Sequence, residues 1–228
     1  MTKPVIVNVG IGSWCPRGSL RLRDSLHAND KDTDLLQWTT EYPPGSPTHE
    51  DIPYAFKVFA IEAAIGFGYR HVMWLDSAAI VHRPLAPLWE IVGQGGWFFC
   101  DNGYITGEWC SDKALENLCV ERDYAMQVPS VTGGCFALDT KNALAQEFLH
   151  SLKRAALDGS TFPGAWVNDE GVCSADPRVK GHRHDQSAMS LIVDRLGMYV
   201  HPKKNKVFCN EVPVDQVPEE ILISNHGM

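Results

Sequence analysis

The chain has 228 residues, 44% hydrophobic and 21% charged, which is the composition of an ordinary globular protein with a substantial core. Its formal net charge of −8 at pH 7 argues against a non-specific polyanion binder, because such proteins present a surplus of Lys and Arg to phosphates. Its seven cysteines form no CxxC pair and make an odd total, which favours neither a disulfide framework nor a zinc knuckle.

Cysteine usage and hydropathy also bear on location. We expect the cysteines to be reduced thiols, as in a cytoplasmic protein. No stretch approaches the roughly 18 to 20 apolar residues of a membrane span, and the first residues, MTKPVIVNVG, lead directly into a strand. No linker, repeat or low-complexity tract divides the sequence, so we predict a single domain over residues 1–228.

The first predicted elements are two strands separated by a loop and a short helix. The β-branched run Val5–Val9, closed by glycines, predicts a strand buried on both faces. A loop with Arg17, Arg21 and Arg23 follows, before a short helical pattern. Residues 32–40 then predict a second strand.

A strand that ends on an acid comes next. The Pro-rich segment 41–53 is expected to be an exposed loop. Residues 54–66 have apolar residues at helical spacing before two glycines, and the run HVMWL predicts a strand that ends at Asp76. This alternation of strands and helices is typical of a mostly parallel sheet covered by helices.

The second half continues the alternation but includes a long irregular segment, and long loops in compact domains are often functional. We expect strands in 95–103 and 131–139, a helix over 141–157, an irregular loop over 160–184, a helix over 184–197 and a short strand that leads to His226.

The turn after the first strand contains two glycines. A dinucleotide-binding fold would require GxGxxG, but Cys15 stands at the third glycine position after Gly10 and Gly12. The motif therefore predicts a tight turn and disfavours a Rossmann-type oxidoreductase. The arginines that follow could still face a nucleotide.

Asp76 allows two interpretations. Ligands in open α/β sheets bind beyond the carboxyl ends of strands, where this acid could help to hold a divalent cation and a diphosphate. Asp also ends strands by turning the chain through a hydrogen bond from its side chain. The residue by itself does not decide between the two.

Two further polar clusters stand near the end of the sequence. The HxHD cluster at residues 182–185 differs in spacing from the metal site of metallo-β-lactamase-like hydrolases. Asp185 is also a candidate N-cap for the following helix, and it shares a face with that helix's apolar residues. His226 follows the apolar run ILIS, which would hold it in place.

Taken in order, these segments resemble the nucleotide-sugar glycosyltransferases of the GT-A fold, of the kind found in bacteria and viruses. The resemblance rests on VIVNVG, PYAFKVFAIEAAIGFGYRHVMWLDSA, VTGGCFALD, RHDQSAMSLIVDRLGM and the final NHG. It implies a single α/β, Rossmann-related domain with a mostly parallel central sheet flanked by helices. The nucleotide-binding half would cover about residues 1–100, and the acceptor half about residues 101–228.

The resemblance also implies a metal site. Asp76 matches the first acid of the family's DxD motif, with Ser77 in the middle position and Ala78 in place of the second acid. In such enzymes the motif binds Mn²⁺ or Mg²⁺, which bridges the two phosphates of a donor such as a UDP-sugar. His226 matches the C-terminal histidine that often completes the coordination.

Other site residues are implied in the same way. An inverting transfer needs a carboxylate base, for which Asp185 is the first candidate and Asp101 the second, while in a retaining mechanism Gln186 could contact the sugar. The expected donor neighbours are Val9 and Gly10 at the base and ribose, Arg17, Arg23 and Lys57 near phosphate, and Gly133 and Gly134 near the sugar and acceptor.

We therefore expect transfer of a sugar from a nucleotide sugar to an acceptor hydroxyl. The acceptor could be a polysaccharide, a lipid-linked glycan, a protein or, least expected from the charge, a modified nucleic acid. Because Ala78 replaces an acid, a noncatalytic relative that binds a nucleotide or a glycan is the alternative.

Overall fold

The structure is a computed structural model that describes residues 3–210 and 212–226. Its strands are β1 Val5–Val9, β2 Asp34–Trp38, β3 His71–Leu75, β4 Ala79–Val81, β5 Trp97–Phe98, β6 Asp101–Ile105, β7 Pro129–Val131, β8 Cys135–Asp139, β9 Phe208–Asn210 and β10 Ile223–Asn225. Its helices are α1 Cys15–Asn29, α2 Phe56–Gly66, α3 Ala86–Gly95, α4 Asp112–Leu118, α5 Arg122–Ala125, α6 Ala143–Leu157 and α7 His184–Arg195, with short 3₁₀ turns at Thr106–Trp109, Asp169–Gly171 and Val214–Gln216.

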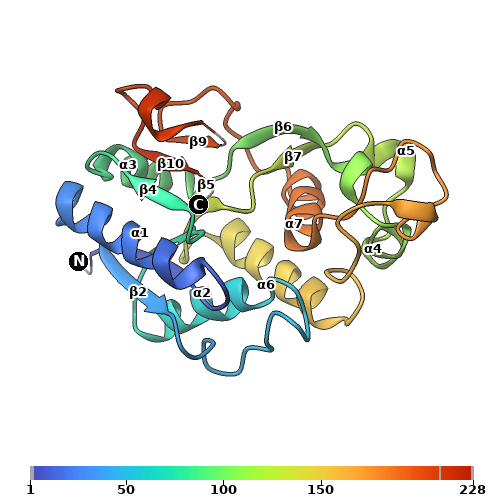
Figure 1. The fold of residues 1–228 in the computed structure, drawn as a ribbon, viewed down its shortest axis with the longest axis horizontal. Helices are drawn as coiled ribbons and strands as arrows, with labels where there is room; N and C mark the ends of the chain where they lie inside the picture. Colours follow the sequence, from blue (N-terminus) through green and yellow to red (C-terminus); the bar gives the residue numbers. More distant parts are fainter. Residues whose placement is uncertain (1–2, 211, 227–228) are drawn as a thin grey trace.

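Five strands form the central sheet, in the order β2-β1-β3-β8-β5 (Figure 1). Val7 of β1 pairs in parallel with Leu36 of β2 and with Trp74 of β3. Strand β8 runs antiparallel to both β3 and β5, so four of the five strands point the same way. This confirms the predicted mostly parallel α/β sheet.

Helices cover both faces of this sheet because its strands alternate apolar residues between the faces. Val5 and Val7 of β1 pack with α2, α6 and α7, whereas Ile6 packs with α1 and α3. In β3, Trp74 packs in the same core as Val5 and Val7, and Met73 packs in the same core as Ile6. Full burial of one such side chain contributes about 1.5–3 kcal/mol, so the two cores on one sheet stabilise the fold.

A second, small sheet brings the C-terminal segment to the end of β3. Strand β10 pairs antiparallel with β4 and parallel with β9. The backbone N–H of His226 donates to the carbonyl of Ala78 at 3.1 Å. Residues 223–226 therefore lie beside the segment that follows Asp76, which is visible where β4, β10 and the label C meet in Figure 1.

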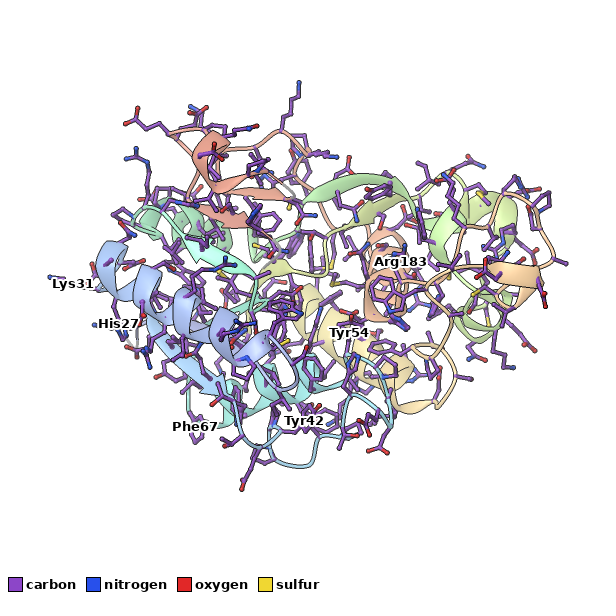
Figure 2. All side chains as sticks on the ribbon, viewed as in Figure 1. His27, Lys31, Tyr42, Tyr54, Phe67 and Arg183 are labelled. Carbon is purple, nitrogen blue, oxygen red and sulfur yellow. The ribbon has the colours of Figure 1, made fainter. Side chains whose placement is uncertain are left out.

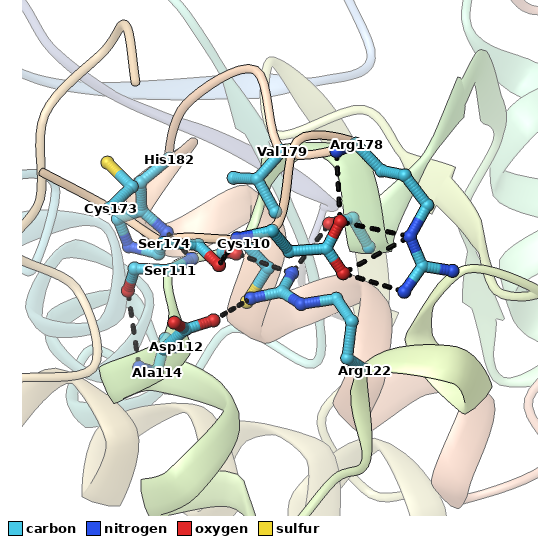
Figure 3. Close-up of polar contacts among 12 residues, drawn as sticks. Cys110, Ser111, Asp112, Ala114, Arg122, Cys173, Ser174, Arg178, Val179 and His182 are labelled. Atoms are coloured by element: carbon cyan, nitrogen blue, oxygen red, sulfur yellow. Dashed lines mark hydrogen bonds and ion pairs between the residues drawn. The ribbon is translucent and has the colours of Figure 1, made fainter. Parts of the chain in front are cut away.

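Residues 160–183 are irregular, as predicted for 160–184, apart from the short turn at Asp169–Gly171, and His184 already belongs to α7. Polar contacts tie this segment to α4 and α5, as Figure 3 shows for several of them. The backbone N–H of Ser111 donates to Nδ1 of His182 at 3.2 Å, and the N–H of Asp112 donates to the carbonyl of Cys173 at 3.0 Å. The long loop is thus held against the helices rather than extended into solvent.

The prediction that Arg17, Arg21 and Arg23 lie in a loop after β1 is wrong, because α1 already begins at Cys15 and contains all three. Pro16 fits the first turn of a helix, where its missing N–H costs nothing. Gly18, Leu22 and Leu26 are buried at helical spacing on the face toward the sheet. Among the described residues, every helix is too short or too polar to cross a membrane.

Candidate active site

The site begins with Asp76, which directly follows β3 at the carboxyl end of the sheet. Its backbone N–H donates to the carbonyl of Gly134 at 2.9 Å, which fixes the end of β3 to the start of β8. The Trp74 indole donates to Oδ1 of Asp76 at 2.8 Å. Because 35% of the side chain is exposed, the second oxygen, Oδ2, is available for other partners.

Lys57 of α2 lies between two carboxylates from different parts of the fold. Its Nζ is 2.8 Å from Oδ2 of Asp185 and 3.6 Å from Oδ1 of Asp76. It also donates to the carbonyl of Gly133 at 2.8 Å. Lys57 is 3% exposed and Asp185 is also buried, so this ion pair is shielded from water.

Burial and charge act in opposite directions on this pair. Burial alone lowers the pKa of Lys57, but the carboxylates of Asp185 and Asp76 outweigh it and raise the pKa above its ordinary value. The rings of Tyr54 and Trp74, at 5.0 and 5.3 Å from Nζ, further favour the charged form. For Asp185, burial raises the pKa and Lys57 offsets only part of that effect.

Asp185 lies in the first turn of α7, and the alternative of an N-cap is wrong. The N-cap position belongs to Arg183, which makes no capping hydrogen bond with its side chain. His184 starts the helix with a left-handed φ of 50°, which is unusual for a residue with a side chain. Its Nδ1 lies 2.9 Å from the carbonyl of Phe162, and this contact helps to hold the turn that aims Asp185 inward.

Two glycines between β7 and β8 allow the acids to approach the backbone. A Cβ at Gly133 would lie 3.3 Å from Oδ2 of Asp185, and one at Gly134 would lie 3.0 Å from Oδ2 of Asp76. Oε1 of Gln186 accepts from the N–H of Gly133 at 3.1 Å. The structure therefore brings Asp76, Asp185, Gln186 and both glycines together.

Ala78, where the sequence lacks the second acid, binds the C-terminal segment through its backbone. Its carbonyl accepts from Arg21 at 2.8 Å and from the N–H of His226 at 3.1 Å. Arg21 also donates to the carbonyl of His226 at 3.0 Å. Arg21 thus joins α1, the acidic turn and the C-terminal segment, a role that the sequence analysis did not assign to it.

Asn225 is a second polar residue that the sequence analysis missed. Its Nδ2 would lie 3.1 Å from a Cβ at Gly134, on the same side as Oδ2 of Asp76. Its Oδ1 is buried and has no hydrogen-bond partner within the described residues. No group of three His, Cys, Asp or Glu in residues 3–210 and 212–226 could hold a metal ion. The amide group of Asn225, next in sequence to His226, thus lies beside Asp76, and an amide oxygen is among the oxygen ligands that Mg²⁺ prefers.

Ser77 and the end of β1 form the wall of the site rather than its opening. The hydroxyl of Ser77 lies 3.1 Å from that of Ser19 and 3.3 Å from the Asn8 amide and the Val9 carbonyl. A Cβ at Gly10 would overlap the Ser19 side chain. These contacts explain the glycine after β1 by the close approach of α1.

The remaining predicted residues lie apart from this cluster. Arg23 pairs with Asp24 at 3.0 Å on the solvent side of α1, and Arg17 is exposed on the same helix. Oδ1 of Asp101 accepts from the N–H of Gly103 at 2.6 Å, which shapes the turn inside β6. No contact in the described residues joins these three side chains to Asp76 or Asp185.

No protein-family model matches the sequence, and none of the curated proteins matches it. Its fold does match solved glycosyltransferases. The apo structure of the bifunctional glycosyltransferase WbbM aligns with a TM-score of 0.52 and 10% identity over 92% of this chain and 40% of that chain. The apo-form glycosyltransferase GlyE of Streptococcus pneumoniae TIGR4 aligns with a TM-score of 0.52 and 13% identity over 100% of this chain and 55% of that chain. The galactosyltransferase LgtC, in complex with donor and acceptor sugar analogues, aligns with a TM-score of 0.50 and 10% identity over 97% of this chain and 86% of that chain.

These similarities establish the fold. The chain spans about 40% of WbbM and 55% of GlyE, so it corresponds to part of each of those proteins. The architecture is that of GT-A-type glycosyltransferases, which confirms the expectation from the sequence motifs.

Proposed function

We propose that the protein transfers a sugar from a nucleotide-sugar donor to the hydroxyl of an acceptor. The observation that carries the proposal is the cluster of Asp76, Lys57 and Asp185 around Gly133 and Gly134, at the carboxyl end of the sheet of a glycosyltransferase fold. Ligands of open α/β sheets bind at this end.

On this proposal, the site would bind a divalent cation, Mn²⁺ or Mg²⁺, together with the donor. Oδ2 of Asp76, the amide oxygen of Asn225 and the imidazole of His226 would hold it, together with water and phosphate oxygens. When bound, the cation would stabilise the negative charge of the departing nucleoside diphosphate. Asn225 would supply a ligand where Ala78 cannot.

Asp185 is the proposed base of an inverting transfer. It would take the proton of the acceptor hydroxyl as the new bond to the sugar carbon forms and the bond to the phosphate oxygen breaks. Its raised pKa favours proton uptake, because burial weakens the ionised form. Lys57 would position this carboxylate through their 2.8 Å contact, and in a retaining mechanism Gln186 would instead face the sugar.

Nucleotide binding tests the proposal. We would measure the melting temperature with UDP, GDP and their sugars, with Mn²⁺ or Mg²⁺, and assay each donor for hydrolysis. A donor at 100 times its Kd should stabilise the protein by about 2.7 kcal/mol. Asp76→Asn should lose most of this shift, whereas Asp24→Asn, on the exposed side of α1, should keep it.

The outcomes separate the alternatives. A thermal shift with hydrolysis of one donor supports a transferase. A shift without turnover of any donor, even with acceptors present, favours the noncatalytic relative that binds a nucleotide. If no nucleotide shifts the melting temperature of the wild-type protein, the proposed function is wrong.

A further inference from the structure

Aromatic side chains form a row that runs from the buried charge cluster to the protein surface. The ring centroid of Tyr54 lies 5.0 Å from Nζ of Lys57, and that of Trp166 lies 6.5 Å from Tyr54. The guanidinium carbon of Arg183 is 4.5 Å from the centroid of Trp166 and 3.8 Å from that of Trp109. We call the following residues the aromatic row: Tyr54, Trp166, Arg183, Trp109 and Tyr104.

Two members of the aromatic row are open to solvent. Trp166 is 52% exposed and Tyr104 is 42% exposed. Tyr104 meets Trp109 edge to face, with 6.1 Å between their centroids. Single exposed aromatics are common, but a contiguous set beside a candidate active site is typical of a binding surface.

The aromatic row is held in place before any ligand arrives. Nη1 of Arg183 donates to the carbonyl of Trp166 at 2.6 Å, which fixes the two side by side. At the inner end, Tyr54 and His184 have left-handed φ values of 62° and 50°, and their ring centroids are 5.4 Å apart. Such strained residues cluster at functional sites, and a surface that is already ordered binds with less loss of entropy.

The inner end of the aromatic row meets the proposed base. His184 directly precedes Asp185 in α7, and its ring centroid is 5.1 Å from that of Trp166. Figure 2 shows Tyr54 and Arg183 near each other, while Phe67 lies at the lower left, away from both. A chain that lies along the row would therefore end beside Asp185.

The chemistry of the aromatic row suits a saccharide. A sugar ring presents C–H groups on its faces, which pack on the electron-rich faces of aromatic rings, and hydroxyls around its edge. Nε and Nη2 of Arg183 have no partner among the described residues, so they are free to donate to those hydroxyls. Burial raises the pKa of Tyr54 to about 12, so its phenol is neutral at pH 7.

A nucleic-acid strand also stacks on aromatic rings, but it requires cations for its phosphates. Lys180, at 5.9 Å from the Trp109 centroid, is paired with Glu108 at 2.8 Å. Lys57 at the inner end is paired with Asp185. Arg183 in the row and Lys203, at 5.9 Å from the Tyr104 centroid, have no carboxylate partner among the described residues. Two such cations are few for the successive phosphates of a strand, and the net charge of the chain is −8, so we favour an uncharged ligand.

We propose that the aromatic row binds a neutral oligosaccharide acceptor, with its terminal sugar at the Tyr54 end beside Asp185. This rests on the proposed transferase function and names the class of its acceptor. The acceptor hydroxyl would then lie next to the carboxylate that takes its proton.

Calorimetric titration without any donor tests this. The probes are tetrasaccharides of glucose, of N-acetylglucosamine and of galactose, with an oligothymidylate as the nucleic-acid probe. We expect one saccharide to bind, and Trp166→Ala and Tyr104→Ala each to weaken it about tenfold, about 1.4 kcal/mol. Phe67→Ala is the matched control, because Phe67 is 68% exposed yet outside the row, and it should bind as the wild type does.

The melting temperature of each variant shows that it is folded, and Trp166→Phe should recover part of the affinity. Binding of no saccharide, equal binding by Trp166→Ala, or salt-sensitive binding of oligothymidylate alone would each overturn the proposal. Nucleotide-induced stabilisation is measured separately. Binding of a saccharide without binding of any nucleotide would support the aromatic row as a saccharide site and refute the proposed function. Binding of a nucleotide without binding of any saccharide would refute only the proposal for the aromatic row.

Discussion

Lys57 holds one positive charge between the carboxylates of Asp185 and Asp76, at 2.8 and 3.6 Å. Lys57 and Asp185 are buried, so the charge of either group would lack hydration if its partner were removed. This pair therefore matters both to stability and to the position of the proposed base.

Removal of the Lys57 charge should be costly. In Lys57→Met the buried Asp185 carboxylate loses its partner, and we expect a loss of about 3–5 kcal/mol in the free energy of unfolding. Lys153→Met is the control, because Lys153 pairs with Glu62 at 2.8 Å but both side chains are about one-third exposed. That change should cost about 0–1 kcal/mol. Urea unfolding measures both, and equal losses would contradict the prediction.

His182 should make stability depend on pH. It is fully buried, and burial lowers its pKa from 6.5 to about 4. The unfolded chain therefore binds the proton more strongly, so this contribution is complete above pH 6.5 and falls between pH 6.5 and 4. Its full size is about 3 kcal/mol.

Urea unfolding of the wild type and of His182→Gln, at pH 7 and pH 4.5, isolates this contribution from those of other groups. The variant should be less stable at pH 7, because His182 bridges Ser111 and the carbonyl of Thr161. It should then lose about 2 kcal/mol less than the wild type on acidification. Parallel losses in both proteins would count against the prediction.

The sequence analysis found part of the site at this scale. Asp76, Lys57 and Asp185 could be proposed because their residue types stand in a recognisable order along the chain. Arg21 and Asn225 could not, because their significance lies in contacts with the backbone of Ala78 and the surroundings of Gly134. Such contacts depend on how distant elements pack, which periodicity does not describe.

At the scale of elements, the turn between β7 and β8 connects the two sides of the site. Gly133 faces α7 and Gly134 faces the end of β3, with no room for a Cβ at ordinary distances in either place. The turn thus sets the separation between the proposed base and the proposed metal ligand.

Gly134→Ala should reduce nucleotide binding more than stability. Its Cβ would be 3.0 Å from Oδ2 of Asp76 and 3.1 Å from Nδ2 of Asn225, so one of them must move. We expect a loss of at least tenfold in nucleotide affinity, with about 1–3 kcal/mol of destabilisation.

The control is Gly93→Ala in α3, where no atom lies within 4 Å of the added Cβ. This change should stabilise the protein by about 0.5–1 kcal/mol, because alanine favours the helix, and it should leave nucleotide affinity unchanged. Thermal unfolding and nucleotide titration of both variants measure the two effects. Wild-type nucleotide affinity in Gly134→Ala would contradict the prediction, because it would show that the site tolerates the displacement of Asp76 or Asn225.

Elements with strong local patterns were predicted well. Strands β1, β2 and β3 and helix α6 lie where their apolar runs and spacing place them. Helices α3, α4 and α5 were not predicted. Helix α4 has seven residues and α5 has four, which is too few turns to show a helical spacing of apolar residues. Tertiary contacts therefore decide their conformation.

At the scale of the whole molecule, both hydrophobic cores share the strands of the central sheet. Residues of β1, β3 and β8 contribute alternately to one core and to the other. If the sheet came apart, both cores would be exposed together. We therefore expect the nucleotide-binding half and the acceptor half, divided at about residue 100, to unfold as one unit.

We predict that the chain unfolds in one cooperative transition. Urea curves from tryptophan fluorescence and from far-ultraviolet circular dichroism should coincide. Phe148→Ala in one core and Leu88→Ala in the other should each lower stability by about 2–5 kcal/mol and shift both curves together. Two separate transitions would mean that the halves fold independently.

The order of the sheet was beyond the sequence patterns. They indicated an α/β fold but not that β8 inserts antiparallel between β3 and β5, nor that β10 pairs with β4. Strand pairing depends on long-range contacts, and the resemblance of ordered motifs to a known family implied only a mostly parallel sheet, not the order of its strands.

The contact of Arg21 with the carbonyl of His226 joins residues that are 205 positions apart. A ribosome that adds about 5–20 residues per second makes the second of these about 10–40 s after the first. During that time the nascent chain has the residues of β1 and α1 but lacks the segment that closes the end of β3. The chain therefore cannot assemble this site until residues 223–226 have been synthesised. If the proposed function is correct, incomplete translation products would be unable to bind a nucleotide sugar.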